Sequence, residues 1–211
     1  MDFILYLPIL FFSVILHEFA HGYTAYMYGD DTAYLMGRLT FNPLAHIDLI
    51  GTIILPAICY FMHIPMFGWA RPVPVNFYRL RNPKKDMAKV ALAGPLSNIF
   101  LVLISAIALK AFIAAGVNSD VIAKIFIYSV MINLLLAIFN LIPIPPLDGS
   151  RIVAGIFPYQ AAQKYMRLER YGMYIVIIFI LTGLFNLIVV PVFNLAIKLV
   201  FSFIGVNYGQ F

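Results

Sequence analysis

The chain has 211 residues, of which 63% are hydrophobic and only 11% charged, and its mean hydropathy is +0.95. A soluble domain has an apolar fraction near one half and about a quarter charged residues, so this chain has too little polar surface for a water-soluble globule. Its formal net charge is +5, and the basic residues lie between apolar runs, where they act as orientation signals. We therefore expect a polytopic membrane protein that binds no nucleic acid.

The first apolar run, residues 3–28, is long enough to cross a bilayer, which takes about 20 helical residues. It contains a His-Glu-Phe-Ala-His motif at residues 17–21, which puts both imidazoles on one face of a helix. The motif predicts that His17 and His21 bind one zinc ion and that Glu18 is the general base that takes a proton from water. Because the run carries this site, we expect it to be retained rather than removed as a signal peptide.

A hydrogen-bonded polar cluster without a metal is the alternative interpretation of this motif. A charged side chain in the middle of a membrane costs about 2.5–3.5 kcal/mol, so such groups are rare and usually functional. The chain has only four histidines, which makes a chance match to the motif improbable. A catalytic metal is therefore favoured.

The second apolar run, residues 47–67, is interrupted by Pro56 and Pro65. If it crossed the membrane, the basic residues after it would lie outside, contrary to the positive-inside rule. We therefore expect a re-entrant hairpin, whose irregular backbone is tolerated where it lines a cavity or packs in protein. The basic residues that follow this run are Arg71, Arg79, Arg81, Lys84, Lys85 and Lys89.

The third and fourth apolar runs, residues 87–115 and 121–147, are each long enough for a crossing, and the turn at 116–120 between them carries no basic residue. This turn is expected to be external, which returns the end of the fourth run to the cytoplasmic face. Prolines end the helix there, and Asp148 is the acidic group at the broken end. A helix-end aspartate is the default interpretation, but the motif on the first helix favours Asp148 as the third zinc ligand. A second basic cluster follows on the same side and consists of Arg151, Lys164, Arg167 and Arg170.

The last apolar run, residues 171–205, is longer than one crossing needs, and Pro191 is expected to divide it into a full span and a shorter second piece. The sequence thus predicts an all-α polytopic membrane protein with about five to six membrane segments, a three-helix catalytic core and a hairpin. We expect a single integral-membrane domain over residues 1–211, with its core at about 3–155 and C-terminal membrane segments at about 171–205.

Three blocks of sequence occur in this order: HEFAHG at residues 17–22, AGPLSN at 93–98 and NLIPIPPLDG at 140–149. In these blocks the chain resembles the site-2 protease family of intramembrane zinc metalloproteases, particularly its small bacterial branch without a PDZ domain. The resemblance implies that the two histidines and Asp148 bind one zinc ion per chain and that the motif glutamate is catalytic. It also implies that Asn140 stabilises the oxyanion during hydrolysis, although a hydrogen bond between helices explains this residue equally well.

The same resemblance implies roles for other parts of the chain. Gly94, Pro95 and Asn98 are expected to let the third helix pack closely against the first. Residues 68–76 resemble the family's membrane-associated loop beside the active site, which could receive a substrate strand, whereas an interfacial loop anchored by Trp69 is the alternative.

The chain departs from the wider family at its beginning, where no helix is expected before the metal-binding one. An added stretch, residues 42–48, precedes the hairpin. Its His46 and Asp48 are expected in a solvated loop or cap, and His63 at the membrane interface.

The resemblance implies an enzyme that hydrolyses peptide bonds within or near transmembrane segments of membrane proteins, as in regulated intramembrane proteolysis. Its expected partners are a transmembrane protein substrate and the lipid bilayer. Its expected place is the inner membrane of a bacterial cell, with the active site toward the cytoplasm. The natural substrate, the trigger and the oligomeric state are open at this point.

Three other functions fit the motif less well. A membrane di-iron oxidase uses many histidines on several helices, whereas this chain has four in all. Another class of membrane metalloprotease takes a glutamate as its third ligand, but the only other glutamate, Glu169, lies in a basic loop. A metal transporter or inactive scaffold would bind metal without turnover, and the intact Glu18 weighs against it.

Overall fold

The structure, a computed structural model, describes residues 2–54, 58, 61–62, 70–117 and 119–206. Within this part of the chain the regular elements are helical, which confirms the prediction of an all-α polytopic membrane protein. Four of the described helices are long and apolar enough to cross a membrane: α1 (Asp2–Met27), α4 (Pro83–Ala114), α5 (Asp120–Asn140) and α9 (Leu184–Ile204).

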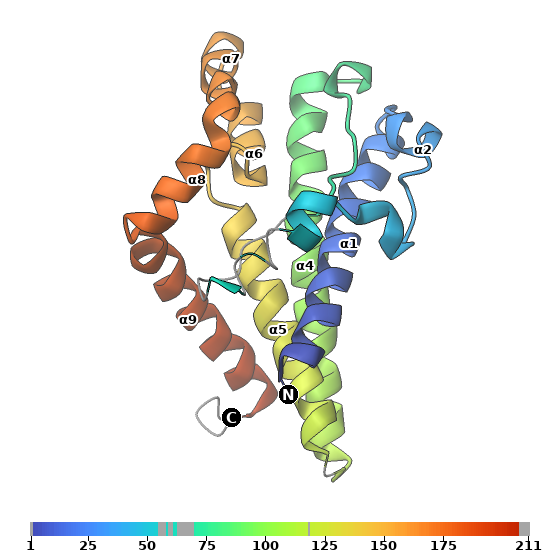
Figure 1. Ribbon diagram of the computed structural model, residues 1–211, viewed down its shortest axis with the longest axis vertical. Coiled ribbons are helices and arrows are strands. Elements are labelled where there is room, and N and C mark those ends of the chain that lie inside the picture. The colour runs from blue at the N-terminus through green and yellow to red at the C-terminus, as the bar shows by residue number, and fades with distance from the viewer. Residues whose placement is uncertain (1, 55–57, 59–60, 63–69, 118, 207–211) are drawn as a thin grey trace.

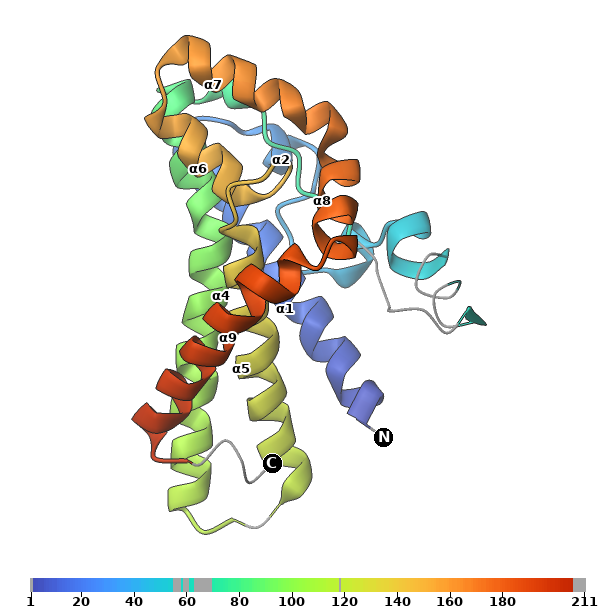
Figure 2. The same ribbon diagram turned by 90° about the vertical axis from the view of Figure 1, so that its left-hand side faces the viewer.

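The centre of the molecule is a bundle of α1, α4 and α5, which pack against one another as the predicted three-helix core (Figure 1). Helices α4 and α5 are antiparallel and are joined by a short turn, where Gly116 has a φ of 65° that favours glycine. Helix α9 crosses the half of α4 and α5 nearest this turn (Figure 2), where Ile197 and Phe201 are buried in one cluster with Leu109 and Val130. These contacts hold the helices together by close packing rather than by exclusion of water, because lipid tails are also apolar.

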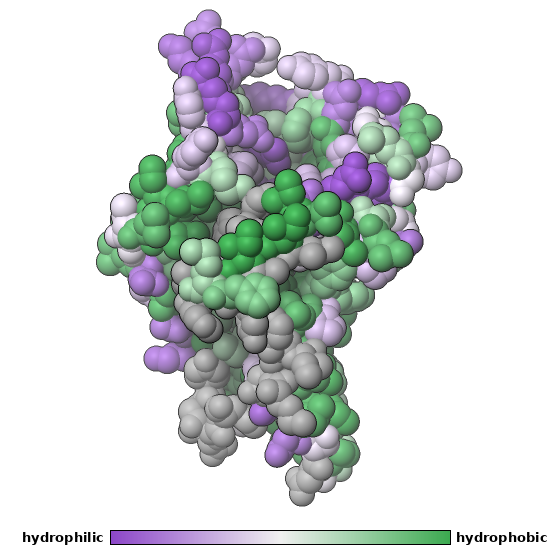
Figure 3. All heavy atoms as spheres, in the orientation of Figure 1, coloured by the Kyte–Doolittle hydropathy of each residue, from purple (hydrophilic) through white to green (hydrophobic). Residues whose placement is uncertain are grey.

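The outward surface of the long helices is covered with large apolar side chains. Phe100, Leu199 and Phe203 are 59%, 63% and 73% exposed, which would be unfavourable in water and is favourable in lipid. On the face shown in Figure 3, apolar side chains gather over the middle of the molecule and hydrophilic ones at the end that α7 forms. This division fits a protein that spans a bilayer with one polar end.

The C-terminal apolar run is divided at a different place from the one predicted. The break lies at Gly183, which has a φ of 78°, between the short helix α8 (Gly172–Leu181) and α9. Pro191 lies inside α9, so the prediction that it divides the run is wrong, and the shorter piece comes first. Membrane helices tolerate an internal proline because neighbouring groups satisfy the carbonyl that it frees, whereas a left-handed glycine changes the direction of the chain.

The described residues between α1 and α4 form only short elements. These are α2 (Thr32–Leu35), the 3-10 helices η1 (Pro43–His46) and η3 (Phe77–Arg79), and the short π-helical segment η2 (Leu49–Ile54). About half of the hairpin predicted for residues 47–67 lies outside the described residues, as do His63 and Trp69.

Two residues of the added stretch before the hairpin were expected in a solvated loop or cap, and the structure confirms this for one of them only. Asp48 is a cap, since its Oδ1 accepts hydrogen bonds from the amides of Ile50 and Gly51 at 3.1 and 2.7 Å. His46 is fully buried instead of solvated, and its Nε2 lies 2.8 Å from the Thr40 carbonyl oxygen within the same loop.

The polar end of the molecule is formed by α6 (Asp148–Ile156), α7 (Tyr159–Met166) and the 3-10 helix η4 (Arg167–Tyr171), with the beginning of α4 beside them (Figures 1 and 2). The two predicted basic clusters belong to these elements and to the segment that precedes α4. Both clusters therefore lie at the end of the molecule opposite the α4–α5 turn. This agrees with the prediction that the two clusters lie on the same side of the membrane.

Candidate metal centre

Helix α1 presents His17 and His21 on the face that it turns toward α4, where both side chains are buried. Gly94 on α4, which has no side chain, leaves space for the two imidazole rings. A Cβ atom at Gly94 would lie 2.4 Å from His21 Nε2 and 2.5 Å from His17 Nε2. The close approach expected of Gly94 is thus correct, and its reason is that any side chain would occupy the space between the two rings.

Asp148 reaches the same place from the end of α5. Helix α5 ends at Asn140, and seven irregular residues rich in proline lead to Asp148, the first residue of α6. The neighbouring Gly149 lies against this turn, since a Cβ atom there would be 2.2 Å from the Leu141 carbonyl oxygen. The glycine therefore lets α6 start directly against the end of α5, which brings the Asp148 carboxylate to the histidines.

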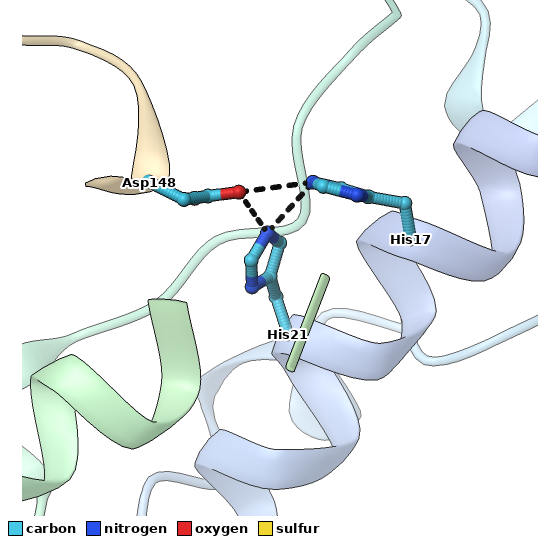
Figure 4. Close-up of side chains that lie close together, drawn as sticks. All are labelled: His17, His21 and Asp148. Carbon is cyan, nitrogen blue, oxygen red and sulfur yellow. Dashed lines mark hydrogen bonds and ion pairs between the residues drawn. The ribbon is translucent and has the colours of Figure 1, made fainter. Parts of the chain in front are cut away.

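The three predicted ligands form a compact triangle (Figure 4). Asp148 Oδ2 lies 3.1 Å from His17 Nε2 and 3.2 Å from His21 Nε2, and the two Nε2 atoms are 3.0 Å apart. Ligand atoms at 2.0–2.1 Å from a tetrahedral zinc ion stand roughly 3.3 Å apart. The triangle has nearly the size that one zinc ion requires.

The hydrogen bonds behind the rings show what the triangle offers to an ion. His21 Nδ1 lies 2.7 Å from the Val90 carbonyl oxygen, which can only accept, so in the neutral ring, the form that binds metal, Nδ1 carries the hydrogen and Nε2 has a free lone pair. His17 Nδ1 lies 2.6 Å from Asn98 Oδ1 and donates in the same way. Both Nε2 atoms therefore point lone pairs at each other and at Asp148 Oδ2.

Electron-rich atoms that face one another with no hydrogen or cation between them are unfavourable when they are buried. With both rings neutral and their hydrogens on Nδ1, the buried Asp148 Oδ2 receives no hydrogen from either Nε2, and three electron-rich atoms that face one another repel. A cation at the centre would satisfy all three atoms at once, and two imidazole nitrogens with a carboxylate are zinc ligands that leave one position open. The donor set fits zinc, although the ligand role of each residue stays a prediction.

Sequence reasoning missed the contacts that Val90 and Asn98 make behind the rings. Asn98 was expected only to allow close packing, yet its side chain bonds His17 directly. The spacing contained a signal, because Val90, Gly94 and Asn98 are four residues apart and share one face of α4. That face is the one turned to α1.

Glu18 lies beside the triangle and contacts the segment 70–76. Its Oε2 accepts a hydrogen bond from the Val73 amide at 2.8 Å. This contact orients the carboxylate beside the triangle. The expected neighbourhood of the segment and the motif is therefore correct in the described residues.

Two further charged side chains hold the same segment in place. The buried Arg38 donates from Nη2 to the carbonyl oxygens of Arg71 and Pro72 at 3.0 and 3.3 Å. Asp30 Oδ2 accepts from the amide of Asn76 at 2.6 Å. Burial, with the nearby Arg71, lowers the pKa of Arg38 from its usual value, but a guanidinium stays charged at neutral pH. The segment is thus fixed to the neighbourhood of α1 by its backbone.

A cavity of about 540 Å³ opens onto the triangle and is large enough for a short stretch of peptide with water. Asn140 lines it, and its Nδ2 donates to the Leu136 carbonyl of its own helix at 3.0 Å rather than to another helix. The polar residues around the cavity are His17, Glu18, His21, Asn140, Asp148, Arg151 and Glu169.

Glu169 lines the cavity without joining the triangle. It pairs with Arg151, which follows Asp148 by one turn of α6 and also lies over the ring of Phe77. The only group of possible metal ligands in the described residues consists of His17, His21 and Asp148. The alternative with a glutamate as third ligand therefore has no support in this arrangement.

Comparison with known proteins identifies relatives over most of the chain. Residues 111–184, which include Asn140 and Asp148, match the family model described as Peptidase family M50. YwhC of Bacillus subtilis, which bears a provisional zinc metalloprotease name, is 36% identical over 208 residues, or 92% of each chain. Rip2 of Mycolicibacterium smegmatis, with the same kind of name, is 28% identical over 177 residues, 82% of this chain and 65% of its own. No solved structure matches the chain significantly.

Proposed function

Because this chain belongs to peptidase family M50, whose members are intramembrane zinc metalloproteases, we propose that it hydrolyses peptide bonds within or near the transmembrane segments of other membrane proteins. The observation that carries this proposal is the buried triangle of His17, His21 and Asp148, with Glu18 at the same cavity. A metal site without a neighbouring carboxylate would suit storage or transport equally well. The carboxylate makes hydrolysis the better explanation.

In the proposed reaction Glu18 acts as both general base and general acid. The two imidazoles and Asp148 would hold the zinc ion, which when bound would supply a Lewis acid for the water and the scissile carbonyl. Glu18 takes the proton of the attacking water and later gives it to the nitrogen of the leaving amine, so the proton is conserved over the cycle. The Val73 amide holds Oε2 throughout, which favours one orientation of the base.

Asn140 is the proposed donor to the developing oxyanion of the substrate. One of its two amide hydrogens bonds the Leu136 carbonyl, and the side chain borders the cavity. A fixed donor of this kind can stabilise negative charge that develops during the reaction. The hydrogen bond to its own helix restricts the rotation of the amide.

The substrate is proposed to be a transmembrane protein whose helix unwinds at the site. Carbonyl groups inside a helix are hydrogen-bonded and shielded, so hydrolysis needs a locally extended backbone. The fixed segment 70–76 borders the cavity through Val73 and Val75, and it could pair with such a backbone. Regulated proteolysis of single-span membrane proteins is the cellular role that this chemistry suits.

The active site is proposed to face the cytoplasm from within the inner membrane of a bacterial cell. His21 lies six residues before the end of α1 at Met27, about 9 Å along the axis at 1.5 Å per residue. This end of α1 belongs to the half of the molecule that contains the basic clusters, which favour the cytoplasmic side. Water therefore has a short path to the site from that side.

The proposal can be tested by comparing membrane proteomes of cells with the wild-type protein and cells with Glu18→Gln. We expect fragments of membrane proteins, cut in or near a transmembrane segment, that accumulate only with the wild type. Purified wild-type protein should cleave the same substrates in vesicles and lose this activity with a zinc chelator. Identical fragment patterns in both cell lines, together with inactive purified protein, would exclude proteolysis.

A further inference from the structure

A line of buried hydrogen bonds runs from His17 across the three core helices. Asn98 on α4, whose Oδ1 bonds His17, donates from Nδ2 to Asn133 Oδ1 on α5 at 2.8 Å. Asn133 in turn donates from Nδ2 to Ser13 Oγ on α1 at 2.9 Å and to the Ser129 carbonyl at 2.9 Å. Both asparagines are completely buried, and Ser13 is 1% exposed. Three side chains, one from each of the three helices, thus form a line that ends at one predicted metal ligand.

One backbone carbonyl determines which atom donates and which accepts in every hydrogen bond of this line. The Ser129 carbonyl can only accept, so the Asn133 atom that faces it is the nitrogen and the atom that faces Asn98 is the oxygen. Asn98 must then turn its nitrogen to Asn133 and its oxygen to His17. Because that oxygen can only accept, His17 Nδ1 must donate.

The other end of the line agrees with this assignment. The Ser13 hydroxyl donates to the Ile9 carbonyl at 2.8 Å, so its oxygen is available to accept from Asn133. No member of the line has to give up a bond to satisfy another. The polarity is therefore unique rather than one of two equivalent choices.

We infer that Asn133 is a positioning residue that acts through Asn98 and determines which nitrogen of His17 carries the hydrogen. A neutral imidazole carries its hydrogen on one nitrogen only, and His17 can bind metal at the triangle only if Nε2 is free of it. The line of hydrogen bonds places the hydrogen on Nδ1 before any metal arrives. This inference rests on the proposed function in one respect, because it takes His17 as a zinc ligand.

His21 is a natural internal comparison. Its Nδ1 is held directly by the Val90 carbonyl, which needs no side chain to fix its polarity. His17 alone depends on side chains from other helices. A change at Asn133 should therefore alter His17 and leave His21 as it is.

The chain also offers a matched control. Ser105 on α4 and Ser129 on α5 are 2.7 Å apart between their hydroxyl oxygens, so they form a buried polar contact between the same two helices. Either hydroxyl can donate in this pair. The pair touches the line only at Ser129 Oγ, a long 3.5 Å acceptor for Asn133 Nδ2, whereas the Ser129 carbonyl that fixes the polarity does not involve Ser105. Loss of Ser105 removes helix–helix bonding without affecting the polarity at the ligand.

The test compares the wild type, Asn133→Leu, Ser105→Ala and His17→Ala by zinc affinity, measured by competition with a chelator. Asn133→Leu keeps a similar volume and removes the acceptor for Asn98. We expect its zinc affinity to fall about 10- to 100-fold, as is typical when a residue behind a metal ligand is lost, and Ser105→Ala to equal the wild type. Equal affinities in Asn133→Leu and the wild type would overturn the inference.

A second measurement on the wild type does not depend on the folding of any variant. ¹⁵N NMR of histidine-labelled protein, stripped of metal by a chelator, distinguishes the two hydrogen positions of each ring, and the chain has only four histidines to resolve. In the wild type we expect the hydrogen of His17 on Nδ1. In Asn133→Leu we expect a mixture of the two neutral forms of His17, one with the hydrogen on Nδ1 and the other with it on Nε2, while His21 is unchanged. A hydrogen on Nε2 of His17 in the wild type would refute the inference.

His17→Ala separates this inference from the proposed function. If it loses zinc while Asn133→Leu binds zinc like the wild type, only the role of Asn133 is wrong. If it binds zinc like the wild type, His17 is not a ligand and both proposals fail.

Discussion

The substitution Gly94→Ala tests the geometry of the metal centre most directly. A Cβ atom at this position would lie 2.4 Å from His21 Nε2 and 2.5 Å from His17 Nε2, about 1 Å inside ordinary carbon–nitrogen contact. The rings cannot move away freely, because Val90 and Asn98 hold their other nitrogens. Metal–ligand distances tolerate only about 0.2 Å, so a displacement of this size removes at least one ligand from the ion.

The expected effect on zinc binding is larger than the effect on folding. Alanine favours a helix interior by about 1 kcal/mol over glycine, which offsets part of the cost of displacing the rings, so the unfolding temperature of metal-free Gly94→Ala should change less than its zinc affinity. Zinc affinity should fall by more than the roughly 100-fold that marks the upper end for residues behind a ligand. Cleavage should be lost together with zinc.

The assay is zinc content after dialysis against a graded chelator, with thermal unfolding of the same samples. Leu96→Ala is the matched control, since this residue is two positions away on α4 and half exposed toward lipid. It should bind zinc like the wild type. Full zinc occupancy and wild-type cleavage in Gly94→Ala would refute the placement of the ion between the two rings.

Four shorter predictions follow from the same site. Glu18→Gln should bind zinc but cleave about 10²- to 10⁴-fold more slowly, whereas His21→Ala should lose both zinc and cleavage; wild-type cleavage by Glu18→Gln would exclude it as the base. Gly149→Ala should lower both zinc content and the unfolding temperature, because its Cβ would lie 2.2 Å from the Leu141 carbonyl oxygen; an unchanged protein would contradict this packing. Glu169→Gln should keep its zinc, and a loss of zinc would restore the glutamate-ligand alternative. Zinc at 100 times its dissociation constant should stabilise the protein by about 2.7 kcal/mol over the chelated form, and equal unfolding temperatures would show that no folded-state site binds it.

The sequence predicted the helices because their signals are local. The length of an apolar run, the two-histidine spacing and the prolines after Asn140 each act within a few residues, and the observed bounds of α1, α4 and α5 agree with them. The same reasoning was wrong at Pro191, since a proline inside a lipid-facing helix has neighbours that compensate for it. Gly183 ended the helix instead, and nothing in the sequence distinguishes a glycine with positive φ from one in a helix.

The partners of the site residues were beyond the reach of the sequence for a different reason. Asn98 is 81 positions from His17, and Val73 is 55 positions from Glu18, so these contacts depend on how α1, α4 and the segment 70–76 pack. His46 shows the same dependence, because its burial comes from the path of a loop.

The sequence alone determined that the chain is a membrane protein, that two imidazoles share a helix face, and that an aspartate ends the fourth apolar run. Only the tertiary structure brought Asp148 within 3.2 Å of both rings and revealed the acceptors that leave their Nε2 atoms free. Helical periodicity is a property of neighbouring residues and can be read from their order. The direction of a lone pair depends on hydrogen bonds between helices that meet only after folding.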